Sequence, residues 1–375
     1  MIVRRLSAVH WRNLAPLDLD VDAPFVVFEG NNGQGKTHVL ELVYALSTLK
    51  PIHGHRLRDA IQWGATTAKA EAQVRSDIGA TRLQLEVAGP LRNLTRDAAK
   101  VSDLGEWFGA LRCVAFTPDD IAVASGEPAL RRRYLDRAAF TAEPAHLDRV
   151  NRVRRLLDHK GAALRSGAAD DVLDALDGAL ADAGAALCEA RARQVAALTS
   201  HVADHHAALA GTGRLALRLR TAAQGDGVAS RAQALSTALA TARAEERRRT
   251  MVLVGPQTDD VELSLDGRAV RNWASRGQVR SVVLALKLAE LSAAAERGDV
   301  PVFLVDDVGS ELDRDRTARL VDRLKGLGAQ VFASTTDARW LRDLPEGETR
   351  LWTMQAGVAL SDLRGNEPIA LDQGS

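Results

Sequence analysis

Residues 30–37 restrict the fold of this chain more than any other segment, because their sequence is Gly-Asn-Asn-Gly-Gln-Gly-Lys-Thr. This is the spacing G-x-x-x-x-G-K-[ST] of a loop that wraps its backbone around phosphate groups. The apolar, strand-like run Phe25–Phe28 precedes the loop, and residues 38–49 follow it with the apolar spacing of a helix. Strand, glycine-rich loop and helix in this order predict an α/β core that binds a nucleotide.

Each residue type in the loop has a physical role in holding a polyphosphate. Glycines let the backbone turn tightly and approach the phosphates. Successive N–H groups and the positive end of the next helix then bind the anion. Lys36 is expected to reach the β- and γ-phosphate oxygens and Thr37 to ligate Mg²⁺, so the predicted cofactors are ATP and Mg²⁺. The predicted phosphate-binding residues are Gly30, Asn31, Asn32, Gly33, Gln34, Gly35, Lys36 and Thr37.

Two further segments carry residues suited to the same chemistry. The apolar run 301–305 ends in Asp306 and Asp307. Ligands of an open α/β sheet bind outside the carboxyl ends of its strands. Asp306 is therefore predicted to hold Mg²⁺, and Asp307 to orient or deprotonate the attacking water. Upstream, Ser275 is a natural helix N-cap, and Gly277 permits an anion to approach the backbone closely.

Composition and charge exclude several other classes of protein. The chain of 375 residues has 49 basic and 49 acidic side chains, so any affinity for nucleic acid must come from local basic patches.

The charged N-terminus lacks the apolar segment of a secretory signal, and no uncharged apolar stretch is long enough for a membrane span. Cys113 and Cys188 lack metal-binding spacing, so both are expected to be reduced core residues of a cytoplasmic protein.

The pattern of apolar residues changes twice along the chain. Strand-like alternation is typical of residues 1–125, whereas residues 126–249 are rich in Ala, Leu, Arg and acidic residues at helical spacing. An α/β pattern returns over 250–375, with a strand predicted at Met251–Val254 and a helix at 278–297. The sequence therefore predicts a nucleotide-binding head split into two parts, with a helical lobe inserted between them.

The order of these motifs resembles that of ATP-binding-cassette-type ATPases, in which Ser310-Glu-Leu-Asp313 would follow the acidic pair. In that superfamily two heads sandwich ATP, and the signature serine of one head faces the γ-phosphate on the P-loop of the other. The resemblance implies an ATP-dependent homodimer in which Ser275, Gly277 and Gln278 contact the nucleotide of a second copy. It makes Lys36, Ser275 and Asp307 the candidate catalytic residues.

The resemblance narrows to the RecF family of SMC-like DNA-repair ATPases. Residues 1–15 end their first strand in Trp11-Arg12-Asn13, as those proteins do, which implies nucleotide contacts for Arg12 and Asn13. Further matching segments are 30–41, 116–121, 126–136, 255–260, 274–290 and 306–313. The resemblance implies binding of gapped DNA or single-strand/double-strand junctions, weak ATP hydrolysis that releases the DNA, and RecR and RecO as partners. The implied roles are recombinase loading in recombinational gap repair, replication restart and the SOS response.

Two segments depart from the patterns of related ATPases. Gln257 and Thr258 stand where the RecF family often has His-Arg, which removes a cation and puts any ligand or DNA contact of that loop in doubt. Ser334-Thr-Thr-Asp337 stands in place of the switch histidine of transporters, and Thr117 in the region of their Q-loop glutamine. Threonine hydrogen-bonds a phosphate or a water but does not act as histidine does, so slow hydrolysis is expected.

Arginine clusters in or beside the helical lobe are the candidate contacts for DNA. They have two interpretations, as solvated helix faces paired with nearby carboxylates or as sequence-independent contacts to phosphates. Tyr134 is the aromatic residue beside one of these runs, and the scarcity of aromatics argues against a stacking platform for single strands. The clusters are Arg131–Arg133, then Arg152, Arg154 and Arg155, and Arg247–Arg249.

Other functions remain open to a chain with these motifs. One is the nucleotide-binding subunit of a transporter, which the Trp-Arg-Asn start, the Ser-Arg-Gly-Gln signature and the absent switch histidine disfavour. Another is a RecF-like paralogue with a different partner. A small-molecule P-loop kinase would have no use for the signature, and a fused nuclease would need more chain after Asp307 than the head leaves.

Overall fold

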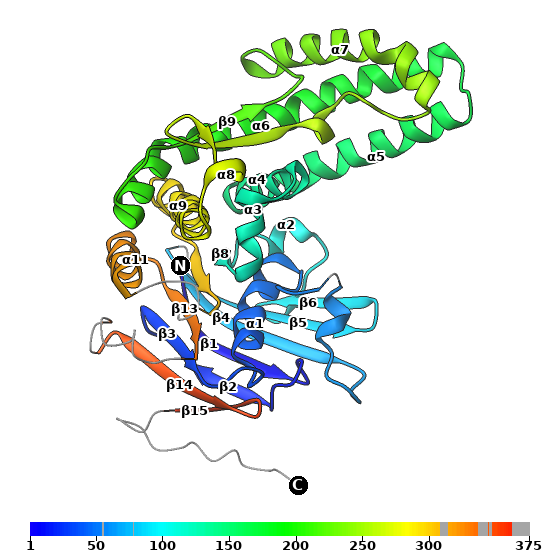
Figure 1. The fold of residues 1–375 in the computed structure, drawn as a ribbon. Helices are drawn as coiled ribbons and strands as arrows, with labels where there is room; N and C mark the ends of the chain where they lie inside the picture. The colour runs from blue at the N-terminus through cyan, green and yellow to red at the C-terminus, as the bar shows by residue number, and fades with distance from the viewer. Residues whose placement is uncertain (55, 78, 308–313, 337–343, 345–346, 362–375) are drawn as a thin grey trace. The chain divides into compact units, whose positions relative to one another are not determined.

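The computed structural model describes residues 1–361 except 55, 78, 308–313, 337–343 and 345–346 (Figure 1). The chain divides into two compact units, Met1–Pro118 with Ala294–Ser375, and Asp119–Ala293. The first unit joins the two ends of the chain, so its sheets are built from segments that an insertion separates. Residues 250–293 lie in the second unit, although the sequence analysis groups them with the head. The three-part division 1–125, 126–249 and 250–375 stays a prediction.

The first unit contains two six-stranded sheets. The first is β1 (Ile2–Val9), β2 (Leu17–Asp20), β4 (Ala68–Ser76), β5 (Gly79–Ala88), β6 (Leu91–Arg96) and β7 (Ala99–Lys100). The second is β3 (Phe25–Glu29), β8 (Cys113–Phe116), β12 (Val302–Val305), β13 (Val331–Thr335), β14 (Thr349–Gln355) and β15 (Val358–Ser361). Smaller helical segments of this unit are η1 (Leu57–Ala60), α2 (Leu104–Trp107) and α11 (Arg314–Leu327).

The two sheets differ in strand direction, and their order confirms the predicted mixed core with antiparallel N-terminal strands. The first sheet has the order β2-β1-β4-β5-β6-β7, and all its neighbours are antiparallel. The second has the order β15-β14-β3-β13-β12-β8, in which β15 alone runs antiparallel to its neighbour. Strand β3 is thus flanked by β14 and β13, which places the loop after it near the middle of the sheet.

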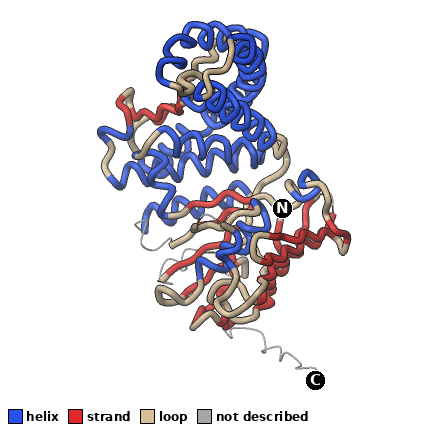
Figure 2. Tube along the Cα trace, turned by 90° about the vertical axis from the view of Figure 1, so that its right-hand side faces the viewer, coloured by secondary structure: helices blue, strands red, loops and turns tan. Residues whose placement is uncertain are grey.

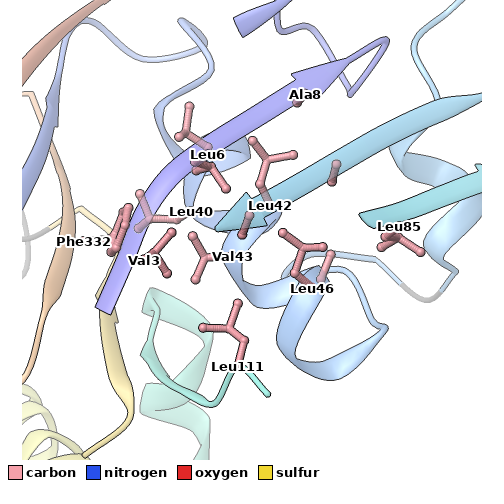
Figure 3. Packing of buried hydrophobic residues seen from close by; sticks show 14 of the residues in the cluster. Val3, Leu6, Ala8, Leu40, Leu42, Val43, Leu46, Leu85, Leu111 and Phe332 are labelled. Atoms are coloured by element: carbon pink, nitrogen blue, oxygen red, sulfur yellow. The ribbon is translucent and has the colours of Figure 1, made fainter. Parts of the chain in front are cut away.

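Helix α1 (Lys36–Thr48) forms the centre of the core of this unit (Figure 3). Its apolar residues recur at helical spacing, and Leu40, Leu42 and Val43 are completely buried. They pack with Leu6 of β1 and Phe332 of β13, so the helix contacts both sheets. Burying each such side chain contributes about 1.5–3 kcal/mol, and this packing fixes where the helix begins relative to the strands.

A buried glutamine ties the first strand to the parallel sheet. The side-chain Nε2 of Gln330 donates to the carbonyls of Val3, Val21 and Ala23, at 2.9, 2.9 and 3.1 Å. Its Oε1 accepts the N–H of Val3 at 2.7 Å. Because a buried amide left without partners costs about 1–3 kcal/mol, this set of bonds favours one arrangement of the strands.

The second unit is mainly helical, as Figure 2 shows in blue, and also contains the small sheet β11-β10-β9. Its helices are α3 (Ile121–Ser125), α4 (Pro128–Ala142), α5 (His146–Arg165), α6 (Asp170–Ala210), α7 (Gly227–Arg249), α8 (Val270–Trp273) and α9 (Arg276–Ala295). Its strands are β9 (Leu215–Arg220), β10 (Asp260–Leu265) and β11 (Arg268–Ala269). The single helix α6 packs against both α5 and α7.

The strand predicted at Met251–Val254 is wrong. Thr250 takes a left-handed backbone with φ of 51° and ends helix α7. The N–H groups of Leu253 and Val254 then donate to the Glu246 carboxylate, at 2.8 and 3.4 Å, instead of to a neighbouring strand. Apolar and β-branched residues there predict a strand, but a carboxylate of the preceding helix accepts the backbone N–H groups that a strand would use.

Candidate functional site

The phosphate loop connects β3 to α1 and needs its glycines for two reasons. Gly30, Gly33 and Gly35 have φ values of 152°, 80° and 99°, which residues with a side chain rarely adopt. A Cβ atom on Gly30 would also lie 2.5 Å from the carbonyl oxygen of Met354. The loop backbone therefore lies close to the neighbouring strand, and Asn31 and Asn32 are exposed at its tip.

The turn between β14 and β15 supports this loop. Gln34 Oε1 accepts the N–H of Ala356 at 2.5 Å, and its backbone carbonyl accepts the N–H of Gly357 at 3.1 Å. The carbonyl of Gly357 in turn accepts the N–H of Ala15 at 3.0 Å. The side chain of Gln34, which the sequence predicts to contact the phosphates, lies on the hairpin and supports the loop.

Lys36 folds over the loop that carries it. Its Nζ donates to the carbonyls of Gly30 and Asn31 at 2.6 and 2.8 Å. Burial lowers the pKa of this amine below its usual 10.5, although the nearby carboxylates Asp307 and Asp306 act to raise it. The amine is thus bound to the loop and is close enough to both acidic residues of the predicted site for their charges to affect it.

Asp306 receives hydroxyl groups from two other segments of the chain. Thr37 Oγ1 donates to its Oδ1 at 2.8 Å, and Ser334 Oγ donates to the same oxygen at 2.6 Å. Burial alone would raise the pKa of Asp306, but the nearby imidazole of His53 and the hydrogen bonds from Ser334 and Thr37 lower it below its usual 3.8. The carboxylate is therefore ionised at neutral pH.

The pairing of Asp306 with Thr37 fits a Mg²⁺ ion. Mg²⁺ takes hard oxygen ligands and usually keeps several waters and phosphate oxygens. Among the described residues, no group of three or more His, Cys, Asp or Glu side chains gathers in a way that would hold a metal. An ion here would therefore depend on one carboxylate, one hydroxyl, water and the phosphates, as predicted from the sequence.

Asp307 lies at a sharp turn after β12. Its φ of 55° is in the left-handed region, which is uncommon for a residue with a side chain. Its N–H donates to Ser334 Oγ at 2.8 Å, so one hydroxyl fixes both acidic residues. The Ser310-Glu-Leu-Asp313 segment and Asp337, both named in the sequence analysis, lie outside the described residues.

His53 is a site residue that no sequence motif indicates. Its Nε2 lies 3.7 Å from Asp306 Oδ2, and its side chain is 44% exposed. The segment is held in place because its carbonyl accepts Nη2 of Arg12 at 3.1 Å and the N–H of Ile52 donates to Glu41 Oε1 at 3.2 Å. The loop after α1 thus places an imidazole beside the carboxylate predicted to bind the metal.

Arg12 and Asn13 differ in their relation to the phosphate loop. The guanidinium of Arg12 binds both oxygens of buried Glu41, at 2.8 and 2.9 Å, which fixes it within the head. Asn13 contacts the loop directly, since its Nδ2 donates to the Gly33 carbonyl at 3.0 Å and its Oδ1 lies 2.6 Å from Nδ1 of His38. A nucleotide contact of either residue stays a prediction.

In the second unit, Ser275 and Gln278 form a reciprocal cap at the start of α9. The N–H of Gln278 donates to Ser275 Oγ at 3.3 Å, and the N–H of Ser275 donates to Gln278 Oε1 at 2.8 Å. This is the capping box, which satisfies donors at a helix N-terminus. Both residues are exposed and Gly277 is half-buried, so the cap lies at the surface of this unit.

Arg131 is a structural residue and not a contact for DNA. It is 4% exposed and binds both oxygens of Asp260, at 2.7 and 3.0 Å. Arg132 donates to the carbonyl of Asp259 at 2.7 Å, so Arg133 is the exposed member of this cluster. A buried ion pair that joins α4 to β10 explains Arg131 without an external phosphate.

The other two arginine clusters remain at the surface. Arg247 pairs with Asp170 at 2.5 Å, and Arg248 and Arg249 pair with Glu245, which agrees with a solvated helix face. The second cluster, on α5, is exposed, and its members are Arg152, Arg154 and Arg155.

The aromatic residue beside the first cluster is not a platform for bases. Tyr134 is 3% exposed, and its hydroxyl donates to the carbonyl of Leu286 at 3.3 Å. Two tryptophans that the sequence analysis did not single out are exposed instead. Trp63 is 101% exposed and Trp273 is 72% exposed. The burial of Tyr134 agrees with the prediction that this cluster has no stacking platform, and exposure of the tryptophans depends on packing that the sequence pattern does not show.

The loop with Gln257 and Thr258 has a structural role in the second unit. Arg191 binds Asp259 Oδ2 at 2.8 Å and the carbonyl of Pro256 at 2.7 Å, with both charged groups buried. Thr258 Oγ1 donates to the carbonyl of Gly255 at 2.8 Å and closes the turn. The acidic pair of this motif therefore anchors the loop to α4 and α6.

Comparison with known proteins decides the family. No family model matches the chain. The DNA replication and repair protein RecF of Geobacter sulfurreducens is 39% identical over 350 residues, covering 91% of this chain and 94% of that protein. The protein of the same name from Myxococcus xanthus is 38% identical over 360 residues, covering 93% and 94%. This chain belongs to the RecF family.

Solved structures agree with RecF membership at the level of the fold. The recombination mediator protein RecF with ATP, of the RecFOR pathway, matches with a TM-score of 0.86 at 23% identity, over 96% of this chain and 97% of that chain. The Smc head domain with a coiled coil and joint from Pyrococcus yayanosii matches with a TM-score of 0.58 at 12% identity, over 96% of both chains. The predicted fold, a mixed α/β head with a helical insertion, is confirmed.

Membership in the RecF family settles the broad function. The chain is a DNA replication and repair ATPase, which confirms the leading interpretation of the sequence over the transporter, kinase and nuclease alternatives. Within the described residues, none of the helices combines the length and apolar character needed to cross a membrane.

Proposed function

We propose that the chain binds ATP and Mg²⁺ at the phosphate loop, that bound ATP joins two copies around DNA, and that hydrolysis releases them. The observation that carries the proposal is the hydrogen bond of 2.8 Å between Thr37 Oγ1 and Asp306 Oδ1. It brings the hydroxyl at the start of α1 to the carboxylate at the end of β12. These are the two oxygen ligands that a P-loop ATPase uses for its metal.

Each residue near this bond has a distinct task in the proposed reaction. Mg²⁺, when bound, neutralises charge on the phosphate oxygens. The Thr37 hydroxyl donates a hydrogen bond to Asp306, and its oxygen lone pairs remain available to the ion. The Ser334 hydroxyl donates a second hydrogen bond that holds the carboxylate in its orientation. Lys36 supplies a positive charge to the β- and γ-phosphates. Asp307 orients the attacking water or accepts its proton.

Slow hydrolysis is part of the proposal. Ser334 occupies the end of β13, where a transporter head has its switch histidine, and its hydroxyl bonds to Asp306 and to the N–H of Asp307. A hydroxyl held by these two bonds positions the acidic residues but does not take up a proton as an imidazole does. The ATPase then acts as a timer for release.

The dimer is inferred from the signature residues. Ser275, Gly277 and Gln278 lie at the N-terminus of α9, where the positive end of the helix dipole favours an anion. Ser275 and Gln278 are exposed, which a contact with a second molecule requires. We propose that this cap completes the nucleotide site of a second copy.

The DNA and protein partners are extended from the family to this chain. One of the similar solved structures is that of a recombination mediator protein, RecF, of the RecFOR pathway. By that relation we propose RecO and RecR as partners, gapped or junction DNA as the ligand, and the cytoplasm as the location. The exposed arginines of α5, Arg152, Arg154 and Arg155, are the proposed phosphate contacts, and binding through them would weaken with salt. A paralogue of RecF with another partner is the alternative.

The experiment measures nucleotide binding, dimerisation by sedimentation, and ATPase rate, each with and without a gapped duplex. Lys36→Ala is expected to lose nucleotide binding. Ser275→Ala is expected to bind ATP but neither dimerise nor hydrolyse it. Ser200→Ala, which removes an exposed hydroxyl elsewhere in the same unit, is the matched control and should behave as wild type. Wild-type behaviour of Ser275→Ala would refute the shared site.

A further inference from the structure

An exposed tryptophan lies two residues before the signature serine. Trp273 ends the short helix α8 and is 72% exposed, which is unusual for so large an apolar side chain. The guanidinium carbon of Arg268, on β11, lies 5.7 Å from the centroid of its ring. This distance is within the range of a cation–π contact. The Arg268–Trp273 pair is thus an ordered surface feature.

The segment that carries this pair is strongly basic. Arg268, Arg271, Arg276 and Arg280 fall within thirteen residues, and the first three are exposed. The acidic residue in the turn before them, Asp266, accepts the N–H of Arg214 at 2.8 Å. In a chain whose net charge is zero, this is a local excess of positive charge. It favours an anionic partner.

The distance along the chain identifies that partner. Two residues span at most about 7 Å, so Trp273 and Ser275 belong to the same small region of the surface, and a large partner seated on Ser275 covers that region. The proposed function places a second copy of this chain, with its bound triphosphate, against Ser275. The arginines complement the charge of that triphosphate, and the indole supplies apolar area that association would bury.

We infer that the Arg268–Trp273 pair is a contact surface for the second copy in the ATP-dependent dimer, beside the nucleotide that Ser275 completes. The inference rests on the proposed function. It adds that dimer affinity depends on the aromatic ring as well as on the signature hydroxyl. DNA is the less favoured occupant. Trp273 lies two residues from Ser275, which the proposed function places against the second copy, and no comparable observation places the ring against a nucleic acid strand.

The test uses the full chain with Mg²⁺ and a slowly hydrolysed ATP analogue, and measures nucleotide affinity and dimerisation separately. Trp273→Ala is expected to keep the nucleotide affinity of the single head and to weaken dimerisation about tenfold or more, as loss of a central aromatic contact does. Trp273→Phe should retain most of the wild-type dimer affinity. Trp63→Ala removes a fully exposed tryptophan from the other unit and should change neither.

The outcomes separate this inference from the proposed function. If Trp273→Ala dimerises as wild type while Ser275→Ala does not, the shared site stands and the contact surface is refuted. If both dimerise as wild type, the proposed function fails as well. Normal dimerisation of Trp273→Ala with weaker DNA binding in the absence of nucleotide would assign the ring to DNA and overturn the inference.

Discussion

Replacing Arg131 by methionine tests whether this arginine holds the second unit together or contacts DNA. The side chains of Arg131 and Asp260 are 4% and 5% exposed, and two hydrogen bonds join them. Arg131→Met keeps much of the side-chain volume and removes the charge. Asp260 is then left buried, with Arg220 at 4.0 Å as a nearby cation.

The structure sets the size of the expected loss. Removing one partner of a buried pair costs about 3–5 kcal/mol, because the other charge stays without compensation. Arg220 is 61% exposed and screened by solvent, so it offsets only part of this cost. We expect a loss near the lower limit, about 3 kcal/mol. For a unit of this size that lowers the melting temperature by about 6–12 °C.

The assay compares thermal unfolding with DNA affinity as a function of salt. Arg133→Met, on the same helix but exposed, is the matched control and should leave the melting temperature almost unchanged. The double variant Arg131→Met with Asp260→Leu removes both charges and should recover part of the stability. The structural role is refuted if Arg131→Met melts as wild type while the salt dependence of DNA binding falls by about one phosphate contact.

Three further predictions follow from the site and its surroundings. His53→Ala should raise the Mg²⁺ concentration needed for nucleotide binding by several-fold, because it removes the imidazole beside Asp306. Titration with a labelled ATP analogue measures this, and His53→Gln should preserve more of the affinity. Equal binding curves for wild type and His53→Ala would show that the imidazole does not position Asp306. Gly30→Ala should abolish nucleotide binding, because its Cβ would meet the Met354 carbonyl at 2.5 Å; normal binding would show that the loop relaxes. Burial would raise the pKa of Asp260, but Arg131 holds it below its usual 3.8. The stabilisation by this pair is therefore complete above about pH 4 and disappears as the pH falls through the lowered pKa, and acid titration of unfolding should show a smaller loss in Arg131→Met.

Part of the site can be predicted from the sequence because it depends on interactions between residues close together in the chain. The glycine spacing of residues 30–37 predicts the loop, since the positive φ values at Gly33 and Gly35 depend on the residues themselves. Apolar residues ending in Asp306 predict a strand with a carboxylate at its tip. Ser275 and Gln278 predict their own capping box, because both partners lie within one turn of helix.

The rest depends on contacts between distant segments. Arg131 is paired with Asp260, 129 residues away, and no periodicity within α4 distinguishes it from exposed Arg133. His53 has no motif around it and meets Asp306 only because its loop is anchored to α1. The pairing of β9 with β10 in the small sheet does not follow from the sequence for the same reason, since helix α7 separates these two strands.

The sequence alone predicted an α/β core with a phosphate loop, a strand that ends in Asp306 and a helix cap at Ser275, and it showed the resemblance to the RecF family. These depend on backbone conformation and on hydrogen bonds between near neighbours, which a short stretch of residues specifies. Tertiary structure alone decided which arginines are buried pairs, that a histidine lies beside Asp306, and that Trp273 is exposed. Burial and pairing are properties of packed elements, and a side chain acquires them only when residues far apart in the chain come together.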